Sequence, residues 1–175
     1  MLGMQKIIDP VSKEALLDEL TKERYVRKAN NGNNEIYIIT NNNAPNVMRE
    51  IGRLREVTFR HAGGGTGKEI DIDDFDISSR PYQQLLVWSP EDKEIVGAYR
   101  FILCKDAEFN NGKVHLATTE LFEFSNQFYK EYLNETIELG RSFIQPLFQP
   151  GENKRKGLFS LDNLWDGLGA IVIDN

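Results

Sequence analysis

The chain has 175 residues, of which 40% are hydrophobic and 27% charged, and its formal net charge is −6. These values suit one globular domain large enough to bury a core, and the acidic balance argues against a nucleic-acid-binding protein, which usually presents a broad basic face. The single cysteine, Cys104, excludes an internal disulfide framework and a cysteine-rich zinc site, and a reducing compartment is the simplest fit.

Hydropathy gives no sign of a membrane segment. Residues 1–10 contain no apolar run of signal-peptide length, and no stretch reaches the roughly 20 apolar residues of a membrane span. We therefore expect a cytoplasmic protein that can contact the inner face of the membrane peripherally. We expect one domain over residues 1–175, in which residues 1–40 contribute a helix and strands.

The first part of the chain predicts a helix, a pair of strands and a second helix. Residues 12–23 have the N-cap serine and the apolar spacing of an amphipathic helix. Two β-prone runs, 25–29 and 35–40, flank an asparagine- and glycine-rich turn and suit a hairpin. Pro45 fits the first position of the next helix, which we expect to continue to about His61.

The loop after that helix, Gly63–Lys68, resembles a phosphate-binding loop only superficially. The Walker pattern needs glycine at position 62 and Ser or Thr at position 69, where this chain has Ala62 and Glu69. A run of five carboxylates then extends from Glu69 to Asp76. It fits a calcium loop poorly, because Phe75 occupies the fifth ligand position and Asp76 the glycine position. In isolation this run suits a solvated loop.

Residues 83–89 and 95–104 give the clearest hairpin of the sequence. Both are apolar, strand-like runs, and a short turn that begins with proline joins them. A further helix is expected between Ser125, a good N-cap, and about Asn134. The sequence therefore predicts at least two paired strands followed by a helical connection.

The strand predicted at residues 136–144 organises the rest of the chain. It has apolar residues on both faces, as strands inside a sheet normally do. It also contains Glu138 and Arg141, and each should have a partner because burying a lone charge is expensive. The basic, glycine-containing loop 149–157 and a helix from Ser160 follow, and this order of elements is typical of an anion-binding site.

Four short motifs occur in an order and at intervals that resemble a known family. They are Arg55-Glu-Val-Thr-Phe59, Asp71-Ile-Asp-Asp-Phe-Asp76, Gly97-Ala-Tyr-Arg100 and Glu138-Leu-Gly-Arg141. With Leu164-Trp-Asp-Gly167, they resemble the acyl-homoserine-lactone synthases. They resemble still more closely the acyl-carrier-protein-dependent N-acyltransferases that make ornithine and glycine lipids, a group often labelled haemolysin. The resemblance covers roughly residues 47–169 and implies an α/β (α+β) fold of the GNAT type, a mixed, mostly antiparallel sheet flanked by helices.

The resemblance implies transfer of a long-chain fatty acyl group from acyl carrier protein to the amine of a small amino acid, glycine or ornithine. It implies a phosphopantetheine-linked donor, with acyl-CoA as the alternative, no tightly bound cofactor and no metal. The catalytic candidates are Glu138, Arg141 and Arg100. The candidate substrate-binding residues are Arg55, Phe59, Asp71, Asp73, Asp76 and Phe143.

Each candidate has a structural alternative. Glu138 is the candidate base, directly or through a water, or else one half of a structural ion pair. Arg100 and Arg141 are expected to pair with the acidic loop and with Glu138, or to serve as scaffold. Phe143 lines an acyl channel or belongs to the core. Cys104 ends an apolar strand with no histidine close in sequence, which favours core packing over an acyl-enzyme nucleophile.

The donor side is predicted from a basic cluster. Lys154, Arg155 and Lys156 suit contact with the phosphopantetheine phosphate or with an acidic carrier protein, and a solvated loop is an equal alternative. The GNAT pyrophosphate pattern, Gln/Arg-x-x-Gly-x-Gly/Ala, does not occur between Arg141 and Ser160, which favours the carrier protein over CoA.

In the family the sheet continues past the last helix, whereas this chain ends at Asn175. We therefore expect a domain that lacks its C-terminal strands. The alternatives to a carrier-protein-dependent N-acyltransferase are an acetyl-CoA-dependent GNAT enzyme and a non-catalytic GNAT-like binding domain. We also expect the strands at 83–89, 95–104 and 136–144 to be neighbours in one sheet, with the helix at 45–61 on one face.

Overall fold

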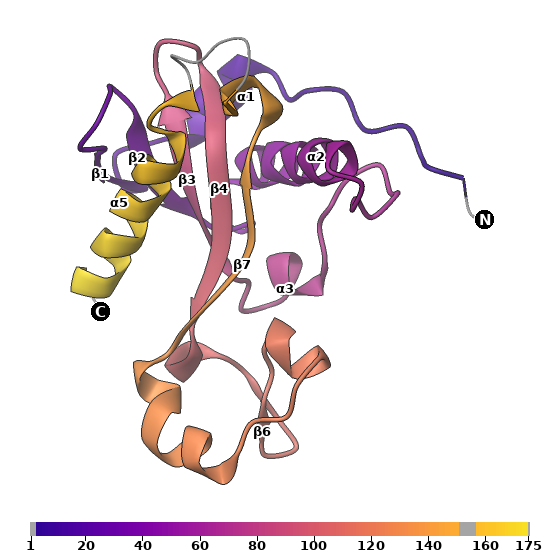
Figure 1. Cartoon of the computed structure of the whole chain (residues 1–175), viewed down its shortest axis with the longest axis vertical. Coiled ribbons are helices and arrows are strands. Elements are labelled where there is room, and N and C mark those ends of the chain that lie inside the picture. The colour runs from indigo at the N-terminus through magenta and orange to yellow at the C-terminus, as the bar shows by residue number, and fades with distance from the viewer. Residues whose placement is uncertain (1–2, 151–156, 175) are drawn as a thin grey trace.

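The computed structural model describes residues 3–150 and 157–174. Five antiparallel strands form one sheet in the order β1-β2-β3-β4-β7, with α1 and α2 on one face and α5 on the other (Figure 1). The strands are β1 Tyr25–Lys28, β2 Glu35–Ile39, β3 Gln83–Ser89, β4 Glu94–Leu103 and β7 Ile137–Ile144, and a separate two-stranded sheet contains β5 Phe109–Asn110 and β6 Lys113–Val114. The helices are α1 Lys13–Glu19, α2 Pro45–His61, α3 Asp74–Ile77 and α5 Ser160–Asp174.

The two faces of the sheet explain the apolar runs in its strands. Along β3, Leu86 and Trp88 pack with α1 and α2, whereas Leu85 and Val87 pack with α5. Successive side chains of a strand point to opposite faces, so a strand covered on both sides is apolar throughout. Helix α2 shows the complementary pattern, because its buried apolar residues recur at helical spacing.

Two glycines of the family motifs allow close packing at the centre of the fold. A Cβ on Gly97 would lie 2.5 Å from the carbonyl oxygen of Phe143, so β4 and β7 could not approach as they do. A Cβ on Gly167 would lie 2.6 Å from a Leu85 methyl group, so α5 could not lie as close to β3. Asp166, between Trp165 and Gly167, accepts hydrogen bonds from the backbone and side chain of Asn30, and this fastens α5 to the turn after β1.

The central predictions are confirmed. β3 has the predicted bounds, α2 runs from Pro45 to His61, and β4 and β7 lie within one residue of the expected ranges. β3, β4 and β7 are neighbours, and α2 packs on the sheet. Helix α1 is shorter than predicted and ends at Glu19, whose carbonyl oxygen accepts a hydrogen bond from the Arg24 guanidinium in the turn that follows.

The prediction that β7 is covered on both sides is wrong. β7 pairs with β4, and its other edge has no neighbouring strand within the described residues. Most of its residues are therefore exposed or half-buried, and Leu139 is 44% exposed. On the α5 side Leu139 lines an open pocket, while Ile137 and Ile144 pack partly buried against the core, which is why the residue pattern alone suggested an interior strand.

Residues 104–136 form a small lobe at one end of the sheet, between β4 and β7 (Figure 1). The lobe contains β5, β6 and several short helical turns. The helix expected after Ser125 becomes a π-helical turn, Phe128–Tyr132, followed by a 3₁₀ turn, Leu133–Glu135. Its core includes Cys104, so the predicted packing role of that residue is confirmed.

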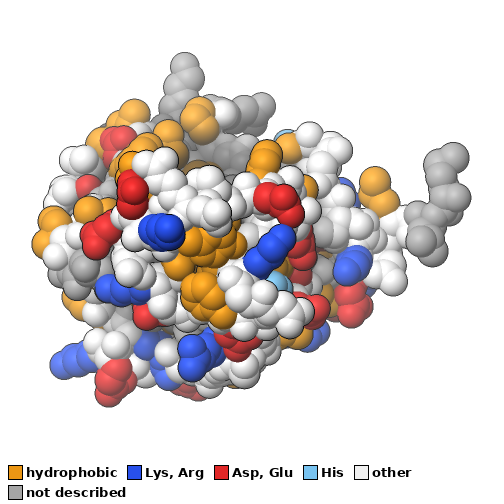
Figure 2. Space-filling view, turned by 90° about the horizontal axis from the view of Figure 1, so that it is seen from below, with side chains coloured by type: hydrophobic (Ala, Val, Ile, Leu, Met, Phe, Trp, Pro, Cys, Tyr) orange, Lys and Arg blue, Asp and Glu red, His pale blue; other side chains and the backbone are white. Residues whose placement is uncertain are grey.

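The lobe also presents apolar side chains to solvent. Seen from the lobe side, orange apolar groups gather near the centre of the molecule with charges of both signs around them (Figure 2). The exposed apolar residues of the lobe are Phe109, Leu121, Phe122 and Tyr132. Among the described residues, no helix is both long and apolar enough to cross a bilayer.

Candidate active site

A closed triangle of polar contacts lies between α2, α3 and β3. Arg55 on α2 places Nη1 2.9 Å from Oδ2 of Asp76 on α3, and its Nη2 donates to Oε1 of Gln84 on β3 at 2.6 Å. The Gln84 amide then donates to Oδ1 of Asp76 at 3.0 Å. All three side chains are buried. Buried charges need this degree of mutual pairing to offset the loss of hydration.

Arg100 on β4 extends this network toward solvent. Its Nη1 lies 2.6 Å from Oδ1 of Asp73 and 3.4 Å from Oδ2 of Asp76. Its guanidinium carbon also lies over the rings of Phe75 and Tyr82, at 5.4 and 5.3 Å from their centroids. Burial opposes the positive charge, but the hydrogen bond to Asp73 and the charge of Asp76 raise the pKa of Arg100. Arg100 therefore stays charged and fixes the two carboxylates.

A bulge in β7 directs Arg141 toward the same carboxylates. Arg141 has φ 52°, and the pairing between β4 and β7 shifts register beside it. Leu139 and Ser142 line one pocket on the α5 side although they are three residues apart. The extra residue therefore turns Arg141 to the opposite face. There its Nε lies 3.4 Å from Oδ2 of Asp71, and its Nη2 lies 3.4 Å from Oδ2 of Asp73.

The acidic loop is therefore not a solvated loop. Asp71 and Asp76 are buried, and the Asp73 side chain is 31% exposed and caps α3. Burial raises the pKa of Asp71, and the charge of Arg141 only partly offsets this effect. Burial would also raise the pKa of Asp73, but the hydrogen bond and charge of Arg100 lower it. Neighbouring carboxylates thus have pKa values shifted in opposite directions.

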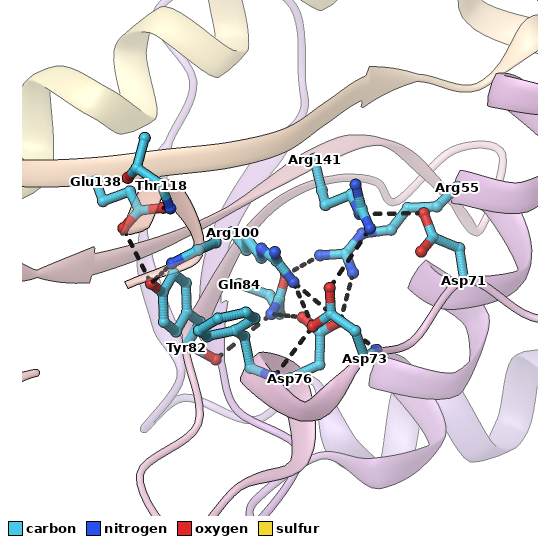
Figure 3. Close-up of polar contacts among 12 residues, drawn as sticks. Arg55, Asp71, Asp73, Asp76, Tyr82, Gln84, Arg100, Thr118, Glu138 and Arg141 are labelled. Carbon is cyan, nitrogen blue, oxygen red and sulfur yellow. Dashed lines mark hydrogen bonds and ion pairs between the residues drawn. The ribbon is translucent and has the colours of Figure 1, made fainter. Parts of the chain in front are cut away.

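Glu138 has different partners from those expected. Its Oε2 accepts a hydrogen bond from the Tyr82 hydroxyl at 3.0 Å, and its Oε1 accepts one from the Thr118 backbone N–H at 3.1 Å. Within the described residues it makes no ion pair with Arg100 or Arg141, so the expected Glu138–arginine contact is wrong. Glu138 lies at one end of the cluster and Arg141 toward the other (Figure 3). Residue spacing suggested a pair, but the bulge and the aromatic side chains separate them.

The structure brings most of the predicted residues together and leaves others outside. Arg55, Asp71, Asp73, Asp76, Arg100 and Arg141 form one network, which confirms the predicted pairing of both arginines with the acidic residues. Phe59 and Phe143 instead pack in or against the core between α2 and the sheet. Lys154, Arg155 and Lys156 lie outside the described residues.

Two members of the cluster were not predicted. Gln84 is a fully buried polar residue at the start of β3, beside the exposed Gln83, and the sequence does not indicate which of the two glutamines is buried. Tyr82 comes directly before the same strand and has no distinguishing pattern. Thr118 is the other hydrogen-bond partner of Glu138. It contributes its backbone N–H, which a side-chain motif cannot reveal.

The opposite face of β7 has an apolar pocket of about 170 Å³. Its lining residues come from β4, β7 and α5 and are Tyr99, Leu139, Ser142, Leu161, Leu164, Trp165 and Leu168. Trp165 is 64% exposed at the edge of this pocket. A single strand therefore separates a charged cluster from an apolar pocket.

Residues 54–156 match the family model described as an acetyltransferase (GNAT) domain. This chain belongs to the GNAT family. The GNAT fold expected from the motifs is thus confirmed, with the five-stranded antiparallel sheet and its flanking helices as described above. No solved structure matches the chain.

The chain as a whole is similar to two curated proteins named glycine N(alpha)-acyltransferase. It is 58% identical to the protein of Bacteroides thetaiotaomicron over 171 residues, which cover 97% of this chain and 51% of the relative. It is 54% identical to the protein of Phocaeicola vulgatus over 171 residues, which cover 97% of this chain and 52% of the relative. The chain therefore spans about half the length of the curated relatives it matches.

The chemistry available in this GNAT domain follows from its geometry. The cluster offers carboxylates that can attract an ammonium group and guanidinium groups that can hold a carboxylate. Glu138 has lone pairs left after its two hydrogen bonds, because a carboxylate accepts at about four positions. The apolar pocket can hold hydrocarbon, and the charged cluster cannot.

Proposed function

We propose that this GNAT domain acts in a glycine N-acyltransferase that moves a long-chain fatty acyl group from a thioester to the amine of glycine. The observation that carries the proposal is the similarity to two proteins named glycine N(alpha)-acyltransferase over 97% of the chain. The charged cluster and the apolar pocket on the two faces of β7 support it, because the reaction joins an ionic acceptor to an apolar acyl chain.

Glycine binds as a zwitterion at the solvent-facing part of the charged cluster. Its ammonium group contacts Asp71 and Asp73, and its carboxylate contacts Arg141, whose side chain is 38% exposed. Oδ2 of Asp71 supports this arrangement, because that atom is buried, lies 3.4 Å from Nε of Arg141 and accepts no hydrogen bond from the described residues. A buried carboxylate oxygen without a donor is a favourable position for an incoming ammonium group.

Glu138 accepts, through water, the proton that the amine must lose, because it lies at the other end of the cluster from Arg141 (Figure 3). The neutral glycine nitrogen then attacks the thioester carbonyl carbon, a C–N bond forms, and the C–S bond breaks with release of the thiol. Arg100 acts in this scheme by holding Asp73 and the aromatic ring of Tyr82 in place. Arg55 and Asp76 support the cluster from beneath and do not contact the substrates, because neither side chain is exposed.

The acyl chain occupies the apolar pocket between β7 and α5. Leu139 and Trp165 frame it, and both are partly exposed in the described part of the chain. Burying such apolar surface under a hydrocarbon chain contributes roughly 25 cal/mol for each Å² removed from water. Acyl carrier protein is the proposed donor, and Lys154, Arg155 and Lys156 are its proposed contacts on the basis of sequence alone.

A hybrid protein tests this function in a full-length setting. The matched region of the Bacteroides thetaiotaomicron relative is replaced by this chain, and the relative itself is the positive control. We expect N-acylglycine from glycine and long-chain acyl carrier protein, with kcat/KM lower for the matching acyl-CoA and for ornithine. A hybrid that folds but acylates no amine would overturn the proposal in favour of a binding domain, and preferential use of acetyl-CoA would identify an ordinary acetyltransferase.

The donor is tested separately by reversing Lys154, Arg155 and Lys156 to Glu in the hybrid. We expect slower association with acyl carrier protein and a weaker dependence on ionic strength, with unchanged use of acyl-CoA. Reversal of Lys6, Lys22 and Lys28, which are exposed in the N-terminal part of the chain, is the control of equal charge. Equal effects of the two triple reversals would refute a local docking role.

A further inference from the structure

Tyr82 connects three parts of the site that the proposed reaction does not otherwise link. Its hydroxyl donates to Oε2 of Glu138 at 3.0 Å and accepts from the backbone N–H of Ala117 in the lobe at 3.0 Å. Its ring lies beneath the Arg100 guanidinium, 5.3 Å from ring centroid to guanidinium carbon. Figure 3 shows the phenol between Glu138 on one side and the acidic cluster on the other.

We propose that Tyr82 is a positioning residue, which aims the carboxylate of Glu138 for proton transfer from glycine. This inference rests on the proposed function, in which Glu138 is the base. Tyr82 does not contact the substrate in this scheme, and it acts through Glu138.

The direction of the hydroxyl hydrogen follows from the two contacts. A backbone N–H can only donate, so the Ala117 contact occupies a lone pair of the Tyr82 oxygen. The single phenolic hydrogen is then directed to Glu138, its only acceptor among the described residues. Burial raises the pKa of Tyr82, so the phenol keeps this hydrogen through the neutral range. Glu138 therefore receives a permanent donor rather than a group that titrates with it.

The carboxylate is held at two points and remains able to react. Tyr82 binds one oxygen and the Thr118 N–H binds the other, so rotation about the last bond of Glu138 would break both contacts. Each oxygen still has a second lone pair for a proton or a water. Two fixed donors also favour the ionised form of a carboxylate, which is the form that a base must have.

The Tyr82 ring also relates the base to the acceptor cluster. Arg100 lies over the ring, and the same guanidinium is 2.6 Å from Asp73. Tyr82 and Arg100 thus fix the position of Glu138 relative to Asp73, a carboxylate proposed to hold the glycine ammonium group. Besides Tyr82 and Arg100, nearby titratable groups are Cys104, whose thiol is buried, and His115, which stacks on the Phe75 ring that packs edge-on against Tyr82.

The test is the variant Tyr82→Phe in the active hybrid, with Tyr37→Phe as a matched control. Tyr37 is also buried, and its hydroxyl donates to Oε2 of Glu35 at 2.7 Å on β2, away from the site. Both variants remove one phenol–carboxylate hydrogen bond and keep the ring, and Tyr82→Phe also removes the acceptor of the Ala117 N–H. We expect Tyr82→Phe to lower kcat about tenfold with little change in the KM for glycine, and to move the acidic limb of the pH–rate profile up by roughly one unit.

Several outcomes decide the question. An unchanged acidic limb and kcat in Tyr82→Phe, or the same shift in Tyr37→Phe, would overturn the inference while leaving the proposed function intact. In a Glu138→Gln background, Tyr82→Phe should cause no further loss, and an additional tenfold loss would show that Tyr82 acts on something else. If phenylalanine prevents folding, 3-fluorotyrosine at position 82 keeps the hydrogen bond with a stronger donor and must move the acidic limb to lower pH.

A readout without catalysis separates this inference from the proposed function. In the isolated chain, carbon NMR of labelled glutamate carboxyl groups identifies Glu138 by the signal that Glu138→Gln removes. The titration midpoint of that signal should rise in Tyr82→Phe and stay constant in Tyr37→Phe. An inactive hybrid with a shifted midpoint would refute the acyltransferase proposal alone. An active hybrid with an unshifted midpoint would refute the role of Tyr82 alone.

Discussion

Arg55 and Asp76 form an ion pair in which Nη1 lies 2.9 Å from Oδ2 and neither side chain has any exposed surface. Gln84 closes the pair into a triangle by accepting from Arg55 and donating to Asp76. These residues hold the first turn of α3 against α2 and β3. The partly exposed carboxylate of Asp73 and the buried carboxylate of Asp71 therefore lie on a rigid support.

Truncation of the buried arginine should be strongly destabilising. Arg55→Ala leaves Asp76 without its closest cation in a fully buried site, and we expect a loss of roughly 3–5 kcal/mol in the free energy of unfolding. Urea denaturation followed by circular dichroism measures it. Lys113→Ala is the control, because its ion pair with Glu123 is 71% and 88% exposed and should contribute nothing measurable. Equal midpoints for Arg55→Ala and wild type would contradict the buried pair.

Asp71 and Asp73 should respond to pH with opposite signs. The folded-state pKa of Asp71 is raised, so its ionisation weakens the fold as pH rises from about 4, the unfolded value, through the folded value. Asp71→Asn should therefore gain stability relative to wild type as pH increases. The folded-state pKa of Asp73 is lowered, so its contribution is present above about pH 4 and lost as pH falls through the folded value.

Asp73→Asn should accordingly be less stable than wild type at neutral pH and should approach it in acid. The measurement is the unfolding free energy of the three proteins between about pH 3 and 7, roughly the range over which carboxylates titrate. Both variants should also lose glycine acylation in the hybrid. If the stability differences of both variants from wild type changed with pH in the same direction, the assigned pKa directions would be contradicted.

Arg141 should matter for glycine binding more than for stability. Its side chain is 38% exposed and its two ion-pair contacts are each 3.4 Å, so its net contribution to folding is small. We expect Arg141→Ala to raise the KM for glycine at least tenfold, with a melting temperature close to wild type. Arg141→Lys should recover part of the affinity, because it restores charge without the planar guanidinium. A KM unchanged in Arg141→Ala would place the glycine carboxylate elsewhere.

Cys104 should be dispensable for transfer and slow to react. Burial, together with the negative charge of Glu138, raises the pKa of its thiol to about 11. The nucleophilic thiolate is therefore scarce at neutral pH, and Cys104→Ala should retain most activity and lose some stability from the cavity. Alkylation of the folded chain should accelerate up to about pH 11. An acyl thioester trapped on Cys104 and identified by mass spectrometry would overturn direct transfer.

The bounds of α2 and β3 were predictable because their residue patterns depend on burial alone. Leu85 to Trp88 alternate between two apolar faces, and the apolar residues of α2 recur at helical spacing. The pairing of both arginines with the acidic run was predictable from the high cost of burying an unpaired charge. These inferences need no knowledge of the position of any distant segment.

The orientation of Glu138 and Arg141 was not predictable from the same reasoning. A residue pattern gives the face of a strand only while the strand is regular, and the bulge at Arg141 reverses that assignment. The partners of Glu138 come from positions 82 and 118, and their approach depends on how the lobe folds back on the sheet. The exposure of β7 was also not predictable. Apolar residues in a strand indicate that another segment can pack on them, but they do not indicate whether one does.

The hydrogen bond from Thr118 to Glu138 uses the backbone and not the hydroxyl side chain. Any residue except proline could supply that N–H, so most amino-acid substitutions at this position would keep the hydrogen bond to Glu138. A change in the number of residues between β4 and β7 would instead displace the N–H along the chain and release one oxygen of the carboxylate. Conservation of spacing, rather than of amino-acid identity, is therefore what comparison of related lobes should reveal around this position.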